Sequence, residues 1–345
     1  MKKTIIALAI LASGSASAAI NVYDKDGVKV DVSGAVEVQA IQTRFAATAP
    51  KDKKKPINLY NDDVKIRLDD GDLQFDVSSV INDDLTVIGS TGFKYEKSQV
   101  ENDLLTVGVK NDTYGTFTIG RQATLVDDSG ISNDIEMGLG FLDSDNNKQS
   151  VFLVTDGDEV AKYKLTNDTY WFGASYGQKS AEEKKEKLKA IDLGAGVIFG
   201  DAAFNAYYQD VDAKTKNLEL THNAYQLEAT YKLDALTFGA SYSDADIKAV
   251  DSKKLTGDLE LIKLTAAYTI ENITYAIGTD RGVLSADGQD LKIYNYYANV
   301  KNKVNDNVSV YGEVGYLNSD KLEKALKSDN ANLELGYVAG LEVKF

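Results

Sequence analysis

The chain of 345 residues contains no cysteine, two prolines, two methionines, one histidine and one tryptophan. The absence of cysteine excludes a disulfide framework, thiolate chemistry and cysteine-based metal sites. A single histidine also leaves little material for a catalytic triad. Basic residues are scarce, 38 against 53 acidic ones, and the formal charge of −15 argues against nucleic acid as a partner.

Long apolar runs are missing except at the start of the chain. Two lysines precede an apolar run, Thr4 to Ala12, that is too short to span a bilayer as a helix. Small residues follow, with an A-x-A cleavage site at Ala16-Ser17-Ala18. We therefore predict a secretory signal peptide at residues 1–18, with cleavage after Ala19 as the near alternative, and one exported domain over residues 19–345.

The sequence is rich in alternating apolar and polar residues. In the stretch YQLEATYKL, which begins at Tyr225, every second residue is apolar, and the alternation resumes after Asp234-Ala235 as far as Tyr242. The same period of two recurs along the chain and returns in its last stretch, Leu333 to Phe345. A period of two over segments of about ten residues predicts the strands of a membrane barrel.

Short turns rich in Asn, Asp and Gly alternate with long polar loops, which implies about sixteen strands with both chain ends on the short-turn side. Aromatic residues flank several short turns, such as Tyr231 with Phe238 and Tyr268 with Tyr275, as rings do at a membrane–water boundary. We predict an all-β fold, a transmembrane antiparallel β-barrel with short periplasmic turns and longer extracellular loops. A barrel of this width encloses a lumen that side chains cannot fill.

Four stretches occur in a suggestive order: AINVYDKDGVKVDVSG after the signal peptide, INDDLT at residues 81–86, TYGTFTIGRQ at residues 113–122, and GLEVKF at the C-terminus. Together they resemble the general diffusion porins of Gram-negative outer membranes, the trimeric sixteen-stranded type. The resemblance implies a passive, water-filled channel for small polar solutes and ions, with its third loop folded into the lumen. It also implies a homotrimer in a bilayer with lipopolysaccharide, and a terminal Phe345 that the barrel assembly machinery reads.

The third loop, residues 122–149, is rich in acids. The resemblance implies that this loop narrows the lumen, with constriction residues Asp127, Asp128, Asp134 and Glu136. On the facing pore wall, three positions that hold arginine in the family fall on Asp72, near Leu104 and near Asp156 here, and the predicted wall residues are Asp72, Asp156, Arg67 and Arg121. Acid on both the loop and the wall predicts a preference for cations.

Other functions stay open. A sugar-specific porin would need a ladder of aromatic side chains along the lumen, where Trp171, Tyr207 and Tyr311 alternate inward. An adhesive surface protein could use the barrel as an anchor. A hydrolase would depend on His222, the single histidine, which no nucleophile motif accompanies, so we predict no enzyme.

No cofactor or metal site is predicted. The spacing from Asp143 to Asn147 opens like a calcium loop, but Lys148 replaces the required glycine and Val154 the final glutamate. The lysine-rich run Lys51 to Lys55 in the first loop is either a solvated loop or a contact with anionic lipopolysaccharide.

Overall fold

The computed structural model describes residues 19–47, 64–95, 99–131, 133–139, 154–181, 186–214, 219–250, 256–286, 288–328, 331–333 and 335–345. The predicted signal peptide, residues 1–18, lies outside these residues and stays a prediction. The lysine-rich run of the first loop and the calcium-like spacing at Asp143 also lie outside them.

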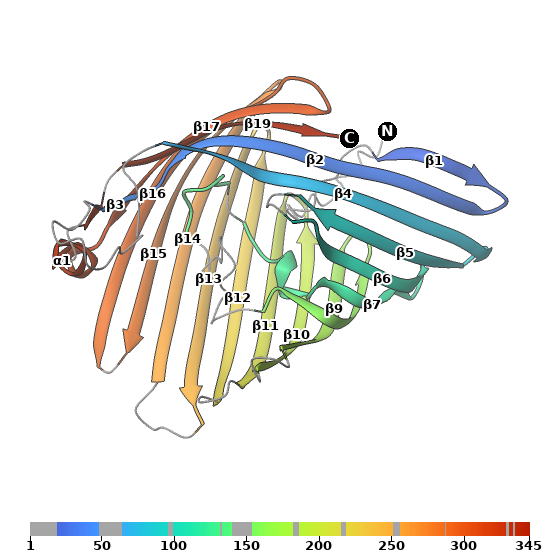
Figure 1. The fold of residues 1–345 in the computed structure, drawn as a ribbon, viewed down its shortest axis with the longest axis horizontal. Helices are drawn as coiled ribbons and strands as arrows, with labels where there is room; N and C mark the ends of the chain where they lie inside the picture. Colours follow the sequence, from blue (N-terminus) through green and yellow to red (C-terminus); the bar gives the residue numbers. More distant parts are fainter. Residues whose placement is uncertain are drawn as a thin grey trace.

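Strands make up almost all of the described chain (Figure 1). No helix within the described ranges is both long and apolar enough to cross a membrane. The strands are β1 Ile20–Lys25, β2 Val28–Gln42, β3 Phe45–Ala47, β4 Lys65–Asn82, β5 Leu85–Lys94, β6 Glu101–Asn111, β7 Gly115–Ala123, β8 Asp156–Thr166, β9 Tyr170–Ala181, β10 Glu186–Phe199, β11 Ala202–Lys214, β12 Glu219–Leu233, β13 Leu236–Ala249, β14 Thr256–Ile270, β15 Ile273–Ala286, β16 Gln289–Lys303, β17 Val308–Asn318, β18 Ala331–Leu333 and β19 Leu335–Lys344. A 3-10 helix η1, Val126–Asp128, and a helix α1, Asp320–Ser328, complete the described elements.

The long strands form a closed barrel, which confirms the predicted fold. Consecutive strands pair antiparallel from β4 to β17, and β19 then pairs with β2, which pairs in turn with β4. The ring contains sixteen strands. Closure pairs each of the sixteen ring strands on both sides, as a lipid-exposed sheet requires.

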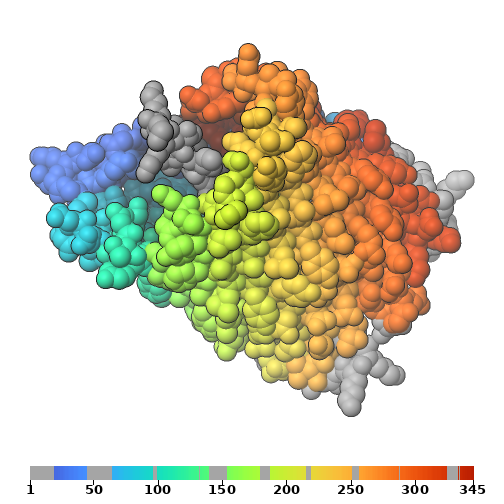
Figure 2. Space-filling view, turned by 180° about the vertical axis from the view of Figure 1, so that it is seen from behind, coloured from blue at the N-terminus to red at the C-terminus, as the bar shows by residue number. Residues whose placement is uncertain are grey.

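Alternation gives the barrel its two faces. The outer face carries the exposed apolar side chains. Figure 2 shows the barrel from behind, with its wall running without a break from the green to the orange part of the chain. The predicted aromatic pairs lie on this face, where Tyr231 is paired in register with Phe238, and Tyr268 with Tyr275. Polar and small residues take most of the inward positions, so the apolar face contacts lipid and the other face lines the lumen.

The predicted short turns are confirmed, and tight left-handed residues form several of them. Asp234 and Glu271, each at the tip of a hairpin, have φ values of 51° and 50°. The sequence also predicts a turn at Asp24 to Gly27, and the structure adds a strand before it, because β1 precedes the ring and turns into β2 at Asp26-Gly27, with φ values of 55° and 76°. A local Asp-Gly turn is enough to form this extra strand.

The barrel is sealed along one edge of β2, which β19 and β1 cover one after the other (Figure 1). Between them, Gly34 and Phe345 exchange two backbone hydrogen bonds, with N···O distances of 2.8 and 3.0 Å. A Cβ at Gly34 would lie 2.6 Å from Cζ of Phe345, so only glycine leaves room for the terminal ring. The predicted assembly residue Phe345 therefore lies at this seam.

A second, two-stranded sheet lies at the long-loop end of the barrel. β3 of the first loop pairs antiparallel with β18 of the eighth loop, and α1 lies beside them (Figure 1). We call β3 and β18 the loop 1–loop 8 sheet.

Candidate functional site

The third loop turns into the lumen directly after β7, which confirms the predicted inward fold of this loop (Figure 1). Its first inward residues, Thr124 and Leu125, are buried. The backbone N–H groups of Leu125 and Val126 donate to Oδ2 of Asp192 on β10, at 2.9 and 3.2 Å. Buried Asp192 thus binds the donors at the start of η1.

Further carboxylates on the wall repeat this arrangement along the loop. We call Asp192, Glu228, Asp280 and Glu313 the wall carboxylates; all of them are buried and stand on β10, β12, β15 and β17. Glu228 accepts from the N–H of Gly130 at 2.6 Å, and Asp280 from that of Leu139 at 2.8 Å. Glu313 accepts from three successive N–H groups, those of residues 135, 136 and 137, at 2.9, 2.6 and 2.8 Å. The pose of the loop is therefore fixed mainly through its backbone.

The tip of the loop fits into a socket in the wall. Met137 is buried in a cluster with Ile41, Tyr297, Tyr311 and Val338. Two glycines make room for it, since an added Cβ would lie 2.4 Å from the Met137 Cβ at Gly315 and 2.9 Å from its Sδ at Gly336. Such distances are far below van der Waals contact, so larger residues at these positions would displace the tip.

The predicted constriction acids Asp127 and Asp128 are neighbours with different surroundings. Asp127 is exposed in the lumen. Asp128 forms ion pairs with Lys162 and Lys164 of β8, at 3.2 and 2.5 Å. The basic groups that pair with Asp128 are therefore lysines of the adjoining wall, which the sequence analysis did not identify.

The other two predicted acids, Asp134 and Glu136, form their contacts at the tip of the loop. Oδ2 of Asp134 accepts from the N–H of Gly138 at 3.1 Å. Glu136 pairs with Arg67 on β4 at 2.8 Å and accepts from Nε2 of Gln39 on β2 at 2.9 Å. The structure thus brings Glu136 and Arg67 together, whereas Asp127 and Asp128 lie with the β8 lysines.

The predicted wall acids Asp72 and Asp156 have different neighbours, and of the two only Asp156 has a charge that acts on Asp127. Asp72 stands opposite Lys94 in the register of β4 and β5, on the inward face. Asp156 begins β8 beside Ala123, and its charge acts on Asp127 together with those of Lys162, Lys94 and Asp128.

Arg121 lies on the opposite face from the one that we predicted. Strand alternation places it with Leu105 and Ile119, two exposed apolar residues of the outer face. Its Nε pairs with Asp158 at 2.8 Å, and its Nη1 donates to Asn102 at 2.8 Å. The resemblance located the motif, but the inward position in it belongs to Gly120 rather than to the arginine.

Sequence reasoning missed the wall carboxylates, the two β8 lysines and Arg44, whose Nη1 donates to the carbonyl oxygen of Met137 at 2.7 Å. The phase of the alternation carries a signal for the carboxylates. Glu228 lies between Leu227 and Ala229 on the polar face of its hairpin, and Glu313 likewise between Gly312 and Val314. The alternation could therefore have predicted that these acids point into the lumen, but not which part of the third loop they bind.

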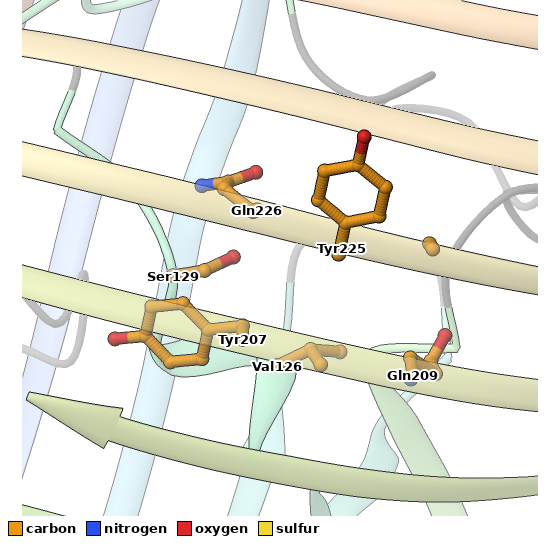
Figure 3. A pocket seen from close by; sticks show the side chains of 7 residues that line it. Val126, Ser129, Tyr207, Gln209, Tyr225 and Gln226 are labelled. Carbon is orange, nitrogen blue, oxygen red and sulfur yellow. The ribbon is translucent and has the colours of Figure 1, made fainter.

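The inward aromatic residues lie beneath the third loop. Trp171 and Tyr207 are buried in a cluster with Leu125 and Val126, and the Lys164 ammonium lies 4.9 Å from the centre of the Trp171 ring. Figure 3 shows a pocket between this part of the loop and the wall, lined by Val126 and Ser129 and by side chains of β11 and β12. The loop thus covers these rings, so they do not form an open ladder for sugars.

One group of acids has a spacing that could suit a metal ion. Ligand atoms of Glu37, Asp70 and Glu342 lie within 4.8 Å of one another. However, Glu342 already pairs with Lys301 and Lys344, at 3.2 and 2.6 Å. The lysines supply the positive charge that an ion would bring.

His222 does not lie in a catalytic arrangement. It is buried on the inward face of β12, in register with Val211 and Ile247, two apolar residues. Among the described residues neither ring nitrogen has a hydrogen-bond partner. A triad needs a nucleophile within hydrogen-bond reach of the base, and this position offers none in the described chain.

Comparisons with known proteins agree with this architecture. The family model described as "Gram-negative porin" matches residues 4–322. Porin-like protein H of Photobacterium profundum is 35% identical over 360 residues, covering 100% of both chains. Among solved structures, OmpT of Vibrio cholerae, expressed in the outer membrane, has a TM-score of 0.73 at 20% identity and covers 94% of this chain and 99% of its own. An anion-selective porin from Comamonas acidovorans has a TM-score of 0.67 at 12% identity, covering 92% of this chain and 100% of its own.

These matches agree with the closed antiparallel barrel. The protein is an outer-membrane channel for small solutes and not an enzyme. The chain belongs to the Gram-negative porin family.

Proposed function

We propose that this porin is a general diffusion channel with a preference for cations. The observation that carries the proposal is the excess of carboxylates around the third loop. Among the described residues, the acids are Asp69, Asp127, Asp128, Asp134, Glu136, Asp156 and the wall carboxylates, and the bases are Arg44, Arg67, Lys94, Lys162, Lys164 and Lys263. An excess of one charge in a confined passage lowers the energy of ions of opposite sign.

The basic groups nearest to the loop are already engaged. Lys162 and Lys164 bridge to Asp128, and Arg67 bridges to Glu136 and Asp69. Asp127 remains exposed to the lumen close to Asp156. A cation that passes the loop therefore meets an acidic surface, whereas the basic groups are screened by their partners. Salt weakens this field over about 8–10 Å.

The proposal predicts the sign of the reversal potential. In a planar bilayer with a salt gradient, the purified protein should give the sign that corresponds to cation flow. We expect the potential to shrink at 1 M salt, where the Debye length is about 3 Å. An anion-selective sign would refute the charge assignment and leave the channel itself intact.

Asp127 should make the preference depend on pH. Partial desolvation inside the barrel raises the pKa of the Asp127 carboxyl to about 6; Asp128 and Asp156 raise it further, whereas Lys162 and Lys94 lower it. Above this pH the carboxylate is charged and attracts cations; below it, the neutral acid does not. We expect cation selectivity to fall between pH 8 and pH 5, with a midpoint near 6. Asp127→Asn should abolish this step, and a step that persists would assign it to another group.

No specific observation favours the other functions. Trp171 and Tyr207 lie beneath the third loop, which weighs against a sugar-specific channel. Neither the described loops nor the position of His222 adds support for an adhesin or a hydrolase.

The assembly of the channel also remains a proposal. A form of the Vibrio cholerae relative OmpT is described as a trimer, and its chain has a TM-score of 0.72 with this one at 21% identity. We infer a homotrimer surrounded by lipid and lipopolysaccharide, made after removal of residues 1–18. The position of Phe345 at the barrel seam supports its role as the residue that the assembly machinery reads.

A further inference from the structure

A side chain at the start of the first loop enters the lumen where β2 ends. Arg44 follows β2 after one residue, and its guanidinium reaches the tip of the third loop. Nη1 donates to the Met137 carbonyl at 2.7 Å and to Oδ1 of Asn295, and Nη2 donates to the Gly138 carbonyl at 3.4 Å. Asn295 on β16 also donates to the Met137 carbonyl, at 2.7 Å. The tip of the third loop is therefore held from two sides. Arg44 binds its carbonyl oxygens, and Glu313 binds its N–H groups.

The surroundings of Arg44 match both the shape and the charge of its side chain. An added Cβ at Gly336 would lie 2.6 Å from Cγ of Arg44, so the glycine makes room for the aliphatic part of the side chain. Carboxylates from three elements, Asp134, Asp280 and Glu313, supply negative charge around the guanidinium. Removing the arginine would leave these acids without a shared counter-charge.

The residues directly after Arg44 belong to a different structure. Phe45–Ala47 form β3, which pairs with β18 of the eighth loop in the loop 1–loop 8 sheet. One short stretch of chain thus joins this sheet to the tip of the third loop. Because β3 begins at the residue after Arg44, a displacement of β3 would move Arg44 and change its hydrogen bonds.

We propose that Arg44 is a positioning residue that couples the loop 1–loop 8 sheet to the constriction. Events at the outer mouth that hold or displace this sheet then change the pose of the third loop, and with it the conductance. The inference goes beyond the ion preference and needs only that the protein is a channel.

A reversible cross-link within the sheet tests the coupling. Ala46 and Asn332 are partners in the register of β3 and β18. Opposite residues of an antiparallel pair lie about 4.5–5.5 Å apart at Cα, within the range of a disulfide. Since the chain has no cysteine, the pair Ala46→Cys and Asn332→Cys forms the single disulfide of the protein. Single-channel currents are recorded before and after reduction.

We expect the oxidised sheet to lower the rate of channel closure by about fivefold or more, the lower range of coupling between sites. In an Arg44→Gln background, reduction should change nothing. An Arg281→Gln background should keep the full response, because Arg281 pairs with Glu260 on the outer face. Thermal unfolding by circular dichroism of each variant shows whether the barrel has formed.

Two outcomes would overturn the inference. One is an equal response with and without Arg44, and the other is a channel whose closure rate ignores the disulfide in every background. Arg44→Lys provides a second variant if the glutamine form does not fold, and it should keep part of the response because it retains the charge but loses the planar fork. The reversal potential, recorded in the same traces, reports separately on the ion preference.

Discussion

Replacing Glu313 with glutamine is expected to turn a steady channel into one that closes often. The glutamine carbonyl cannot accept all three N–H groups that the carboxylate binds at 2.6–2.9 Å, and its amide group turns a donor toward donors. A buried N–H without an acceptor costs about 1–3 kcal/mol. The loss of one such bond shifts the balance between the seated and the released tip by about tenfold. Single-channel recording measures this as shorter open times and added current levels.

Glu342→Gln is the matched control for this change. Glu342 also stands on the inward wall, on neighbouring β19, but it pairs with Lys301 and Lys344 rather than with the third loop. Both variants remove one wall charge, so a pure charge effect would alter them alike. Equal gating in the two variants would show that Glu313 does not hold the loop.

Asp128→Asn should move the selectivity toward anions more than any other loss of one loop acid. Asp128 is the shared partner of Lys162 and Lys164, at 3.2 and 2.5 Å, so its removal uncovers two positive charges in the lumen. A unit charge at about 4 Å is worth about 1 kcal/mol even in water, which corresponds to about fivefold in permeability. We expect the cation-to-anion permeability ratio to fall by at least this factor, measured from the reversal potential.

Two further variants isolate the cause. Asp158→Asn makes the same chemical change on the outer face, where Asp158 pairs with Arg121, and should leave the ratio as it was. Adding Lys162→Gln and Lys164→Gln to Asp128→Asn should restore cation preference. Failure of this rescue would mean that the two lysines are not the exposed charges.

The barrel was predictable because lipid and water impose a simple rule on every strand. Each wall residue must suit either hydrocarbon or the lumen, so a period of two is visible in single stretches such as Tyr225 to Tyr242. Closure followed from the absence of unpaired edges in lipid. None of these steps needed knowledge of long-range contacts.

The contacts of the third loop were not predictable in the same way. Asp192 binds Leu125 and Glu313 binds Met137 across distances in sequence that no local pattern encodes. The resemblance identified the loop, its acids and Arg67, which pairs with Glu136, but it did not identify the β8 lysines that pair with Asp128. It also placed Arg121 on the wrong face, because a motif gives identity and not the phase of the strand.

The seam at β2 has a consequence for how the barrel forms. Val38 pairs with Leu341, so the ring needs a contact between opposite ends of the chain. Contacts of such long sequence separation slow folding, because the entropy of a large loop is lost before the contact stabilises anything. Before β19 is in place, the growing sheet has two unpaired strand edges, and such edges can pair with other chains. Pairing of β19 with β2 therefore determines whether the chain closes into a barrel or associates with other chains.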